Sequence, residues 1–473
     1  MLPKKLIIYL CLLSALLGLQ TRITAGQEPK RRVIAMTDGE IDDRSSMIRF
    51  LLYTNDIDLQ AIIQTNSVYQ RGGWSSEKWI EKQIDAYEKV YPNLLIHDPS
   101  YPSAAELRSK LYVGDEDSTH IMVDQMSARR LPGMDPVIDP AGWPDTPGSD
   151  RIVEVLLQDD PRPVYIQAWG GGNTAARAFY KLKTKYPDDY NKAVSKVVMY
   201  NIWYQDGAGN YIERYHPEVT MVISFNFSGT WDYGSQRYTY QFVSDYLHND
   251  HGPLGELYPQ DYISEGDSPS FLYSVANGLR SSEDPTYGGW GGRFYKVYGN
   301  VYRDADKGSY LRWIEYANRD FEARLDYCVA DKYEEANHKP VIKLKGAPDR
   351  TVMSGEKVEL DAEVSDPDPI NLADAWRKYK TVLEKGGIDS TKFIALSANF
   401  PKYSASWWQY SEADTYDGFI ATTSDPLTSK ISFIAPAVDK PCTIHMILEV
   451  KDQGSPPLTS FKRVIITVLP KDM

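Results

Sequence analysis

The sequence has few cysteines, few histidines and no excess of positive charge. It contains 3 cysteines and 7 histidines among 473 residues. With 52 lysines and arginines against 65 aspartates and glutamates, its formal net charge is −13. An acidic chain is not drawn to a nucleic-acid backbone or an anionic membrane surface, so neither is an expected partner.

Several common catalytic motifs are absent as well. The chain has no HExxH zinc motif, no P-loop ending in Gly-Lys-Ser/Thr and no G-x-S-x-G nucleophile elbow. These absences argue against a zinc peptidase, a P-loop nucleotidase and a serine hydrolase.

A long apolar run occurs at the N-terminus, where "LIIYLCLLSALLGL" follows the positive start "MLPKK" and precedes the small residues "ITAG". The run is short for a bilayer span, so it predicts an export signal over residues 1–25, with an uncleaved anchor as the alternative. The mature protein is then secreted or periplasmic and has no membrane span.

Residues 33–335 alternate short apolar runs with longer amphipathic stretches, as in "RVIAM" followed by "DDRSSMIRFLLY" and "PVYIQAW" followed by "TAARAFYKLKTKY". Strand followed by helix, repeated, predicts an α/β domain with a mostly parallel sheet and helices on both faces. Ligands of such sheets bind at the carboxyl ends of the strands.

Residues 340–473 have a different pattern, with alternating strands such as "KVELDAEVSD" and "FKRVIITVLP" separated by turn formers. This pattern predicts an all-β, immunoglobulin-like sandwich. After signal removal one cysteine remains in each predicted domain, Cys328 and Cys442. Two buried free thiols are favoured over one cross-domain disulfide.

The first strand runs into "MTDGEIDDRSSM", which places four carboxylates within six positions. A helix cap explains Asp42 or Asp43 alone. It does not explain Asp38, Asp42 and Asp43 together, with Gly39 easing the bend. Because hard cations take several oxygen ligands, the turn predicts a metal site, with Ca²⁺ as the favoured ion.

This turn resembles the Asp-Pro-Gly-x-Asp-Asp turn that opens the nucleoside hydrolases. The second strand end, "IIQTNS", and the stretch "VYIQAWGGGNTAARA" resemble later strands of that family, and "EGDSP" resembles its late His-Asp-Pro. The resemblance implies a calcium shell made by Asp38, Asp42, Asp43, Asp267 and the Gly172 carbonyl. No histidine precedes Asp267, so the general acid is not identified.

The motifs "EGDSPSFLY" and "YGGWGGRF" further resemble a subfamily of secreted bacterial proteins that are usually described as cellulose-binding. In that subfamily a nucleoside-hydrolase-like domain precedes an immunoglobulin-like domain. The resemblance covers essentially the whole mature chain and implies a saccharide or nucleoside-like small molecule as partner, including cellulose or a related polysaccharide.

Two functions follow from the resemblance. In the first, a calcium-dependent hydrolase cleaves a ribosyl or other saccharide bond, Asp38 is the general base, and Asn66, Asn173 and Asn210 bind the substrate. An ordinary turn is the alternative role for the stretch that contains Asn210. His248 and His251 are candidates for the missing acid.

In the second function, the protein binds polysaccharide without cleaving it. Candidate aromatic platforms are Trp74, Trp290, Trp407 and Trp408, with core packing as the alternative role for each. A homo-oligomer is compatible with either function.

Overall fold

The computed structural model describes residues 30–121, 139–228, 247–259, 265–368, 401–422 and 427–471, and short pieces at 380, 384–387 and 389–392. The predicted export signal, residues 1–25, lies outside these ranges. Within them, no helix combines the length and the apolar character needed to span a bilayer.

The first part of the chain forms an eight-stranded sheet with the order β3-β2-β1-β4-β5-β6-β8-β7. All neighbouring strands are parallel except the edge pair β7 and β8. The central strands β1 and β4 are buried along almost their whole length, as expected for strands covered on both faces. The strands are β1 Arg31–Thr37, β2 Ile57–Gln64, β3 Leu111–Val113, β4 Val164–Ala168, β5 Val197–Ile202, β6 Thr220–Ser224, β7 Phe294–Tyr298 and β8 Val301–Asp304.

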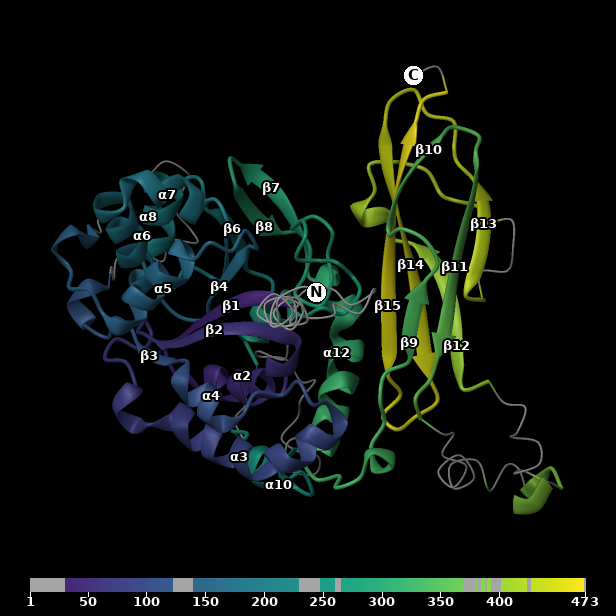
Figure 1. Cartoon of the computed structure of the whole chain (residues 1–473), viewed down its shortest axis with the longest axis horizontal. Coiled ribbons are helices and arrows are strands. Elements are labelled where there is room, and N and C mark those ends of the chain that lie inside the picture. The colour runs from purple at the N-terminus through teal and green to yellow at the C-terminus, as the bar shows by residue number, and fades with distance from the viewer. Residues whose placement is uncertain are drawn as a thin grey trace, which may run out of the picture.

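Helices cover both faces of this sheet (Figure 1). Alternate residues of β1 point into two separate apolar cores, one beneath α2, α3, α11 and α12 and the other beneath α5 to α8. The helices are α2 Ile41–Leu51, α3 Trp79–His97, α4 Ala104–Ser109, α5 Pro147–Leu157, α6 Asn173–Lys185, α7 Pro187–Val194, α8 Ala208–Tyr215, α10 Gly252–Gly255, α11 Ser268–Leu272 and α12 Gly308–Tyr327, with short 3₁₀ turns at Thr54–Asp56, Ser75–Glu77, Ser118–His120, Pro140–Gly142, Tyr333–Glu335 and Ser411–Ala413.

The strand order reverses between β1 and β4. From β1 the chain proceeds outward through β2 and β3, and then returns to place β4 on the other side of β1. In an open α/β sheet, such a reversal leaves a crevice outside the carboxyl ends of the two strands, and ligands bind there. In this chain the crevice lies between the residues after Thr37 and those after Ala168.

The C-terminal part has one four-stranded sheet, β10-β15-β14-β12, and one three-stranded sheet, β13-β11-β9. Their inward side chains share one apolar core. Strand pairs are antiparallel apart from β10 and β15, which are parallel. The strands are β9 Val341–Leu344, β10 Asp349–Met353, β11 Lys357–Ser365, β12 Tyr403–Gln409, β13 Lys430–Ile434, β14 Cys442–Asp452 and β15 Thr459–Leu469.

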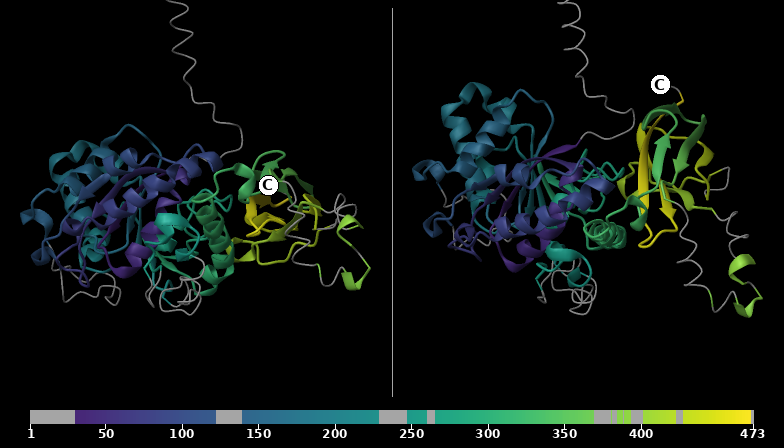
Figure 2. Two further views of the ribbon diagram at one scale, coloured as in Figure 1. Left: turned by 90° about the horizontal axis from the view of Figure 1, so that it is seen from below. Right: turned by 60° about the horizontal axis from the view of Figure 1, so that its bottom comes forward.

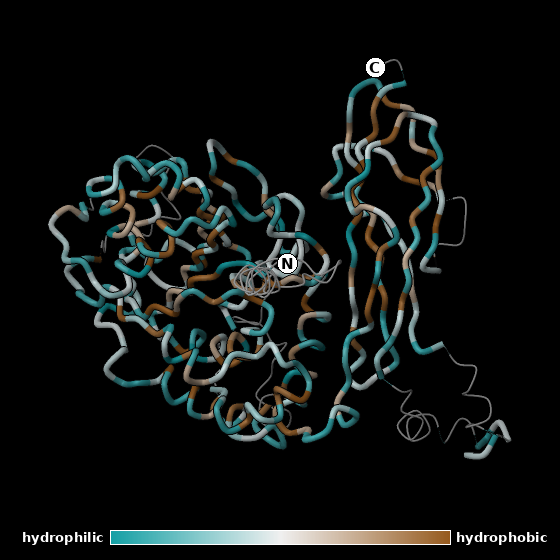
Figure 3. Tube along the Cα trace, in the orientation of Figure 1, coloured by the Kyte–Doolittle hydropathy of each residue, from teal (hydrophilic) through white to brown (hydrophobic). Residues whose placement is uncertain are grey.

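The mixed α/β part followed by β sheets confirms the predicted fold class, whereas the immunoglobulin-like topology and the boundaries 33–335 and 340–473 stay predictions. Cys328 and Cys442 are buried free thiols. Figure 3 shows apolar residues concentrated along the inner strands of both parts. Two further views place α12 between the large sheet and the β sheets (Figure 2).

Candidate metal centre at the end of strand β1

The acidic turn follows β1 directly. Thr37 ends the strand, Gly39 has a φ of +79°, and α2 begins at Ile41. That positive φ favours glycine, so the chain reverses sharply and returns as a helix within three residues. As a result Asp38, on one side of the bend, faces the first turn of α2 on the other.

Asp43 holds this bend together. Its Oδ1 accepts hydrogen bonds from the Thr37 hydroxyl and, at 3.2 Å, from the Asp38 amide. A carboxylate that receives donors near the start of a helix is stabilised by the helix dipole. Neither donor is an amide of α2, and the start of that helix has no side-chain cap hydrogen bond, so the helix-cap alternative does not account for Asp43. These bonds use only one of its two carboxylate oxygens.

Asp267 approaches from a distant segment. It lies at the start of α11, and its amide donates to the Ser46 hydroxyl of α2 at 3.3 Å. Two residues earlier, the fully buried Glu265 forms an ion pair with Arg49 of α2 at 2.5 Å. These contacts fix the start of α11 against α2, and they bring Asp267 beside the first turn of that helix.

Five carboxylates gather at this point, and they fall into two groups. In each group, one oxygen from every residue lies within 4.8 Å of the others, the groups being Asp38, Glu40 and Asp43, and Asp42, Asp43 and Asp267. Asp43 belongs to both groups. All but Glu40 are buried, and Glu40 is half-buried at the edge.

Burial raises the pKa of Asp42, Asp43 and Asp267 well above the usual carboxyl value, and repulsion from neighbouring carboxylates raises it further. The pKa of Glu40 rises to about 7 through burial and the charge of Asp38. Burial also raises the pKa of Asp38, against opposing hydrogen bonds. A cation among these oxygens would relieve both the desolvation and the repulsion.

The donor set fits a hard cation such as calcium. Every potential ligand is a carboxylate oxygen, which is the chemistry that Ca²⁺ prefers. Asp38 Oδ2 and Asp267 Oδ2 are buried and have no hydrogen-bond partner within the described ranges. The neighbouring Arg44 does not balance the charge, because its guanidinium pairs with Glu77 at 2.9 Å and donates to the Gly39 carbonyl at 3.0 Å.

The glycine turn after β4 forms the opposite wall. A Cβ on Gly170 would lie 2.6 Å from Asp38 Oδ2, and one on Gly171 would lie 2.4 Å from the Asn66 carbonyl oxygen. Any side chain at these two positions would displace the facing residues. The glycines therefore allow the backbone after β4 to approach the acidic turn.

The Gly172 carbonyl, predicted as a metal ligand, accepts the Ala176 amide at 2.9 Å and so opens the hydrogen-bond ladder of α6. The amides of Gly172 and Asn173 donate to Asp206 Oδ2, at 2.9 and 3.1 Å. Asp206 thus caps α6 from the end of β5, and burial raises its pKa to about 6. The metal role of Gly172 stays a prediction.

Asn66 and Asn173, predicted to bind substrate, bind each other. Asn173 Nδ2 donates to Asn66 Oδ1 at 2.7 Å, and both residues are fully buried. Asn66 Nδ2 donates in turn to the Arg71 carbonyl, and Asn173 Oδ1 accepts the Thr65 hydroxyl. The pair joins the loop after β2 to the first residue of α6, and its contact with substrate stays a prediction.

Asn210, the third predicted substrate ligand, lies in the first turn of α8 and is half-buried. Its Nδ2 is buried without a hydrogen-bond partner in the part of the chain that the structure describes. The histidines considered as acids have other contacts. His248 Nε2 contacts the Tyr258 carbonyl, and His251 Nε2 lies 3.2 Å from Asp326 Oδ1.

Sequence reasoning left Glu40 and Gly170 out of the predicted site. Glu40 stands inside the motif itself, at a position where the nucleoside hydrolase turn has glycine, and this departure was the available signal. Gly170 is the first residue of the glycine triplet, and sequence alone does not reveal which of the three faces Asp38. In the structure, Gly170 does.

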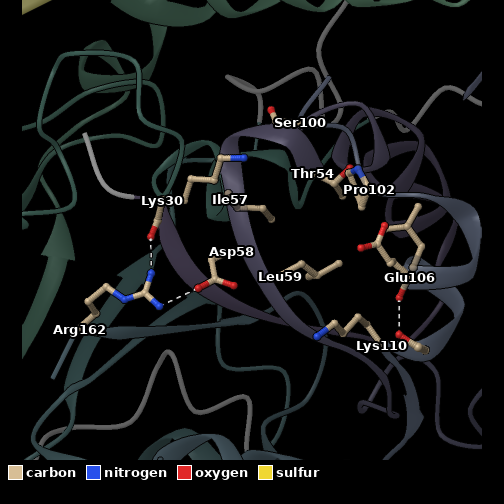
Figure 4. A pocket seen from close by; sticks show the side chains of 12 residues that line it. Lys30, Thr54, Ile57, Asp58, Leu59, Ser100, Pro102, Glu106, Lys110 and Arg162 are labelled. Carbon is tan, nitrogen blue, oxygen red and sulfur yellow. Dashed lines mark hydrogen bonds and ion pairs between the residues drawn. The ribbon is translucent and has the colours of Figure 1, made fainter. Parts of the chain in front are cut away.

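A pocket of about 540 Å³ lies elsewhere, at the amino ends of the first strands (Figure 4). Its wall includes Lys30, Glu106 and Lys110, and an Arg162–Asp58 ion pair of 2.9 Å closes one side. Parallel strands place their amino and carboxyl ends at opposite edges of the sheet. This pocket is therefore separate from the acidic centre, and it contains none of the predicted site residues.

The reversed strand order with an acidic centre at its crevice defines an open α/β protein with a candidate ligand site at the switch point of its sheet. The chain belongs to the family whose model is described as "Cellulose-binding Sde182, nucleoside hydrolase-like domain", which matches residues 32–294. A second model, "Cellulose-binding protein Sde0182, C-terminal domain", matches residues 401–468.

A solved structure similar to this chain is a nucleoside hydrolase-related hypothetical protein from Saccharophagus degradans, described as associated with carbohydrate metabolism. It is 28% identical, the match covers 93% of this chain and 100% of that one, and the TM-score is 0.75. The type III effector XopQ, complexed with adenosine diphosphate ribose, is 10% identical over 64% of this chain and 95% of its own, with a TM-score of 0.36, too slight a likeness to bear on this chain. No curated protein matches the chain.

Proposed function

We propose that this protein is a secreted, calcium-dependent hydrolase that cleaves the glycosidic bond of a ribosyl or other saccharide substrate. The main support is the unpartnered, buried Oδ2 of Asp38 at the strand reversal, beside the carboxylates of Asp42, Asp43 and Asp267. A buried carboxylate oxygen without a donor is unfavourable unless it binds a cation or a reacting group.

Asp42, Asp43 and Asp267 would hold the calcium ion together with Asp38. When bound, the ion supplies Lewis acidity, which lowers the pKa of water and fixes vicinal sugar hydroxyls. Asp38 accepts the proton of the attacking water, and the hydrolysis passes through an oxocarbenium-like transition state. Asn66, Asn173 and Asn210 orient the sugar, and the Asn66–Asn173 hydrogen bond also ties the loop after β2 to the start of α6.

Calorimetric titration of Ca²⁺ into the mature protein tests the first step. We expect saturable binding that Asp267→Asn weakens and that Glu154→Gln, an exposed carboxylate on α5 outside both groups, leaves unchanged. If a metal-defined screen of ribonucleosides and short oligosaccharides finds a substrate, Asp38→Asn should abolish turnover more than it weakens substrate binding. The absence of any Ca²⁺ binding would remove the basis of the proposal.

A second candidate function is polysaccharide binding without cleavage. Two observations favour it: the family description names cellulose binding, and His248 and His251 have partners away from the acidic turn. In both candidate functions the partner is a saccharide outside the cytoplasm, which agrees with the predicted export signal.

The four candidate platforms differ in exposure. Trp290 and Trp407 are buried. The ring centroid of Trp408 lies 6.1 Å from that of Trp313, so Trp408 packs against another aromatic side chain. Trp74 is half-buried beside Gly39, with its indole N–H donating to Gln70 at 2.7 Å. A cellulose pull-down of the full mature chain should therefore be weakened by Trp74→Ala and not by Asp38→Asn. Retention of binding in Trp74→Ala would exclude this platform.

A further inference from the structure

Three titratable side chains form a hydrogen-bonded chain where the α/β part meets the β part. His97 ends α3, His338 lies on the linker between α12 and β9, and Asp368 follows β11. His97 Nε2 lies 3.0 Å from the Ala330 carbonyl oxygen. His97 Nδ1 lies 3.0 Å from His338 Nε2, and His338 Nδ1 lies 3.0 Å from Asp368 Oδ1. All three side chains are buried, and together they are called the junction relay.

The three contacts of the junction relay need three protons. A carbonyl oxygen only accepts, so His97 Nε2 donates to Ala330, and a neutral His97 ring then accepts at Nδ1. His338 Nε2 must therefore donate to His97. His338 Nδ1 faces a carboxylate oxygen, and a hydrogen bond there needs the third proton. Two neutral imidazoles and one carboxylate hold only two protons, so the complete relay holds one more.

The surroundings favour His338 as the carrier of this extra proton. The ring of Tyr333 stacks on His338, with ring centroids 3.7 Å apart and planes 2° apart. The face of an aromatic ring attracts a cation. Burial lowers the pKa of His97, which keeps that ring neutral, as the relay requires. Asp368 Oδ2 also accepts the His338 amide at 2.5 Å, and this bond favours the ionised carboxylate.

The charges around the junction relay also favour a cation. The other titratable or charged groups that face it are Asp326 and Tyr327 at the end of α12, Tyr333 on the linker, Asp366 after β11 and Lys402 before β12. Asp326 and Asp366 act on the two histidines by their negative charge. Lys402 Nζ donates to the Asp368 carbonyl at 3.1 Å, and Asp326 also lies 3.2 Å from His251 Nε2.

We propose that the junction relay is a proton-dependent switch that stabilises the contact between the α/β part and the β part. With the extra proton bound, all three hydrogen bonds form, and they hold the end of α3, the linker and the turn after β11 together. When that proton leaves to water, the lone pair of His338 Nδ1 faces the Asp368 carboxylate, and this contact becomes repulsive. The junction is therefore less stable at alkaline pH.

The direction of the pH dependence follows from the proton count. Above about pH 6.5, the usual pKa of a histidine in an unfolded chain, the relay binds one more proton than the unfolded state. Stability then falls as the pH rises, because the folded state binds the larger number of protons. A difference of one proton raises the unfolding equilibrium constant about tenfold per pH unit. The acidic centre also titrates, so the contribution of the relay is measured as a difference between variants.

The test compares the full mature chain with Asp368→Asn by chemical denaturation between about pH 6.5 and 8.5. The two side chains have the same shape. The Asn oxygen still accepts the His338 amide, and its NH₂ group donates to a neutral His338 Nδ1, so the relay is complete without the extra proton. We expect the unfolding constant of the wild type to rise up to about tenfold per pH unit relative to that of the variant. Asp331→Asn, which changes an exposed carboxylate on the same linker, should follow the wild type.

Parallel pH profiles for the wild type and Asp368→Asn would overturn the proposal, because the relay would then hold no extra proton. His338→Gln is the second variant, since it removes the ring that carries the proton. We expect its pH profile to have the slope of Asp368→Asn at a lower overall stability. A His338→Gln profile with the wild-type slope would overturn the proposal even if Asp368→Asn does not fold.

Discussion

Gly170 contacts the Asp38 carboxylate more closely than any side chain would allow. A Cβ at Gly170 would lie 2.5 Å from the carboxyl carbon of Asp38. Gly170→Ala should therefore push Asp38 out of place, at a cost of about 1–3 kcal/mol in folding free energy. We expect Ca²⁺ affinity to fall about tenfold or more, as when groups that orient metal ligands are changed, and calorimetric titration with chemical denaturation measures both.

Gly72→Ala is the matched control for this substitution. Gly72 lies in the loop after β2, and a Cβ there would meet no atom within 4 Å. Both variants add one methyl group to a loop near the carboxyl ends of the strands, so only the contact with Asp38 distinguishes them. Equal Ca²⁺ affinities in the two variants would show that Asp38 contributes little to the ion site.

The residues that were predictable from sequence were those that one turn brings together. Asp38, Asp42 and Asp43 are near neighbours in the chain, so their meeting required only a strand, a bend and a helix. Asp267 came from the family resemblance, because nothing in its own spacing indicates α2 as its neighbour. The hydrogen bond between Asn66 and Asn173 depends on the order of β2, β1 and β4, which local patterns do not encode.

Helix α2 contacts the segment that leads into α11 at two places. Its first turn carries Asp42 and Asp43 beside Asp267, and its last turn carries Arg49, which pairs with Glu265. Glu265→Gln should leave the guanidinium buried without its counter-charge, at a cost of about 3–5 kcal/mol. Thermal and denaturant unfolding should show this loss, and Ca²⁺ affinity should fall because Asp267 loses its support.

The double variant Arg49→Met with Glu265→Leu controls for the charge. Replacing both members of a buried pair with apolar residues of similar volume is often neutral, so the double variant should be more stable than Glu265→Gln. If the double variant is as unstable as the single one, the pair contributes specific geometry that apolar packing does not replace.

The repeated order of strands and helices could be predicted from sequence, because the spacing of apolar residues changes from one element to the next. It gave β1, β2, β4, β5 and β6 and the helices after most of them. The antiparallel edge pair β7 and β8 was not predicted. Both strands are short and half-exposed, and their edge position leaves them without the continuous apolar run of a central strand. The parallel pairing of β10 with β15 was not predicted either, because β10 is also a short edge strand without a continuous apolar run.

At the scale of the whole molecule, the two parts are joined by an extensive contact. Arg463 of β15 donates to the carbonyls of Tyr287 and Gly288 at 2.8 and 2.9 Å, and burial lowers its pKa to about 10. A Cβ on Gly278 would clash with the Phe461 carbonyl. No pattern within either part predicts this contact, because the same residues would be suitable for a surface or for an internal core.

Trp313 of α12 is the centre of that contact. It is fully buried, with ring centroids 6.1 Å from Trp408, 5.9 Å from Tyr410 and 5.5 Å from Phe461. Because a shared apolar core couples the stability of both parts, we expect the wild type to unfold in one calorimetric transition.

Trp313→Ala should remove about 3–5 kcal/mol and separate that transition into two, because the cavity lies where the parts meet. Trp143→Ala is the control, since this half-buried tryptophan stacks on His120 away from the β sheets. It should lower the stability without splitting the transition. Two transitions in the wild type itself would show that the parts unfold independently, and α12 would then act as a spacer rather than as a shared core element.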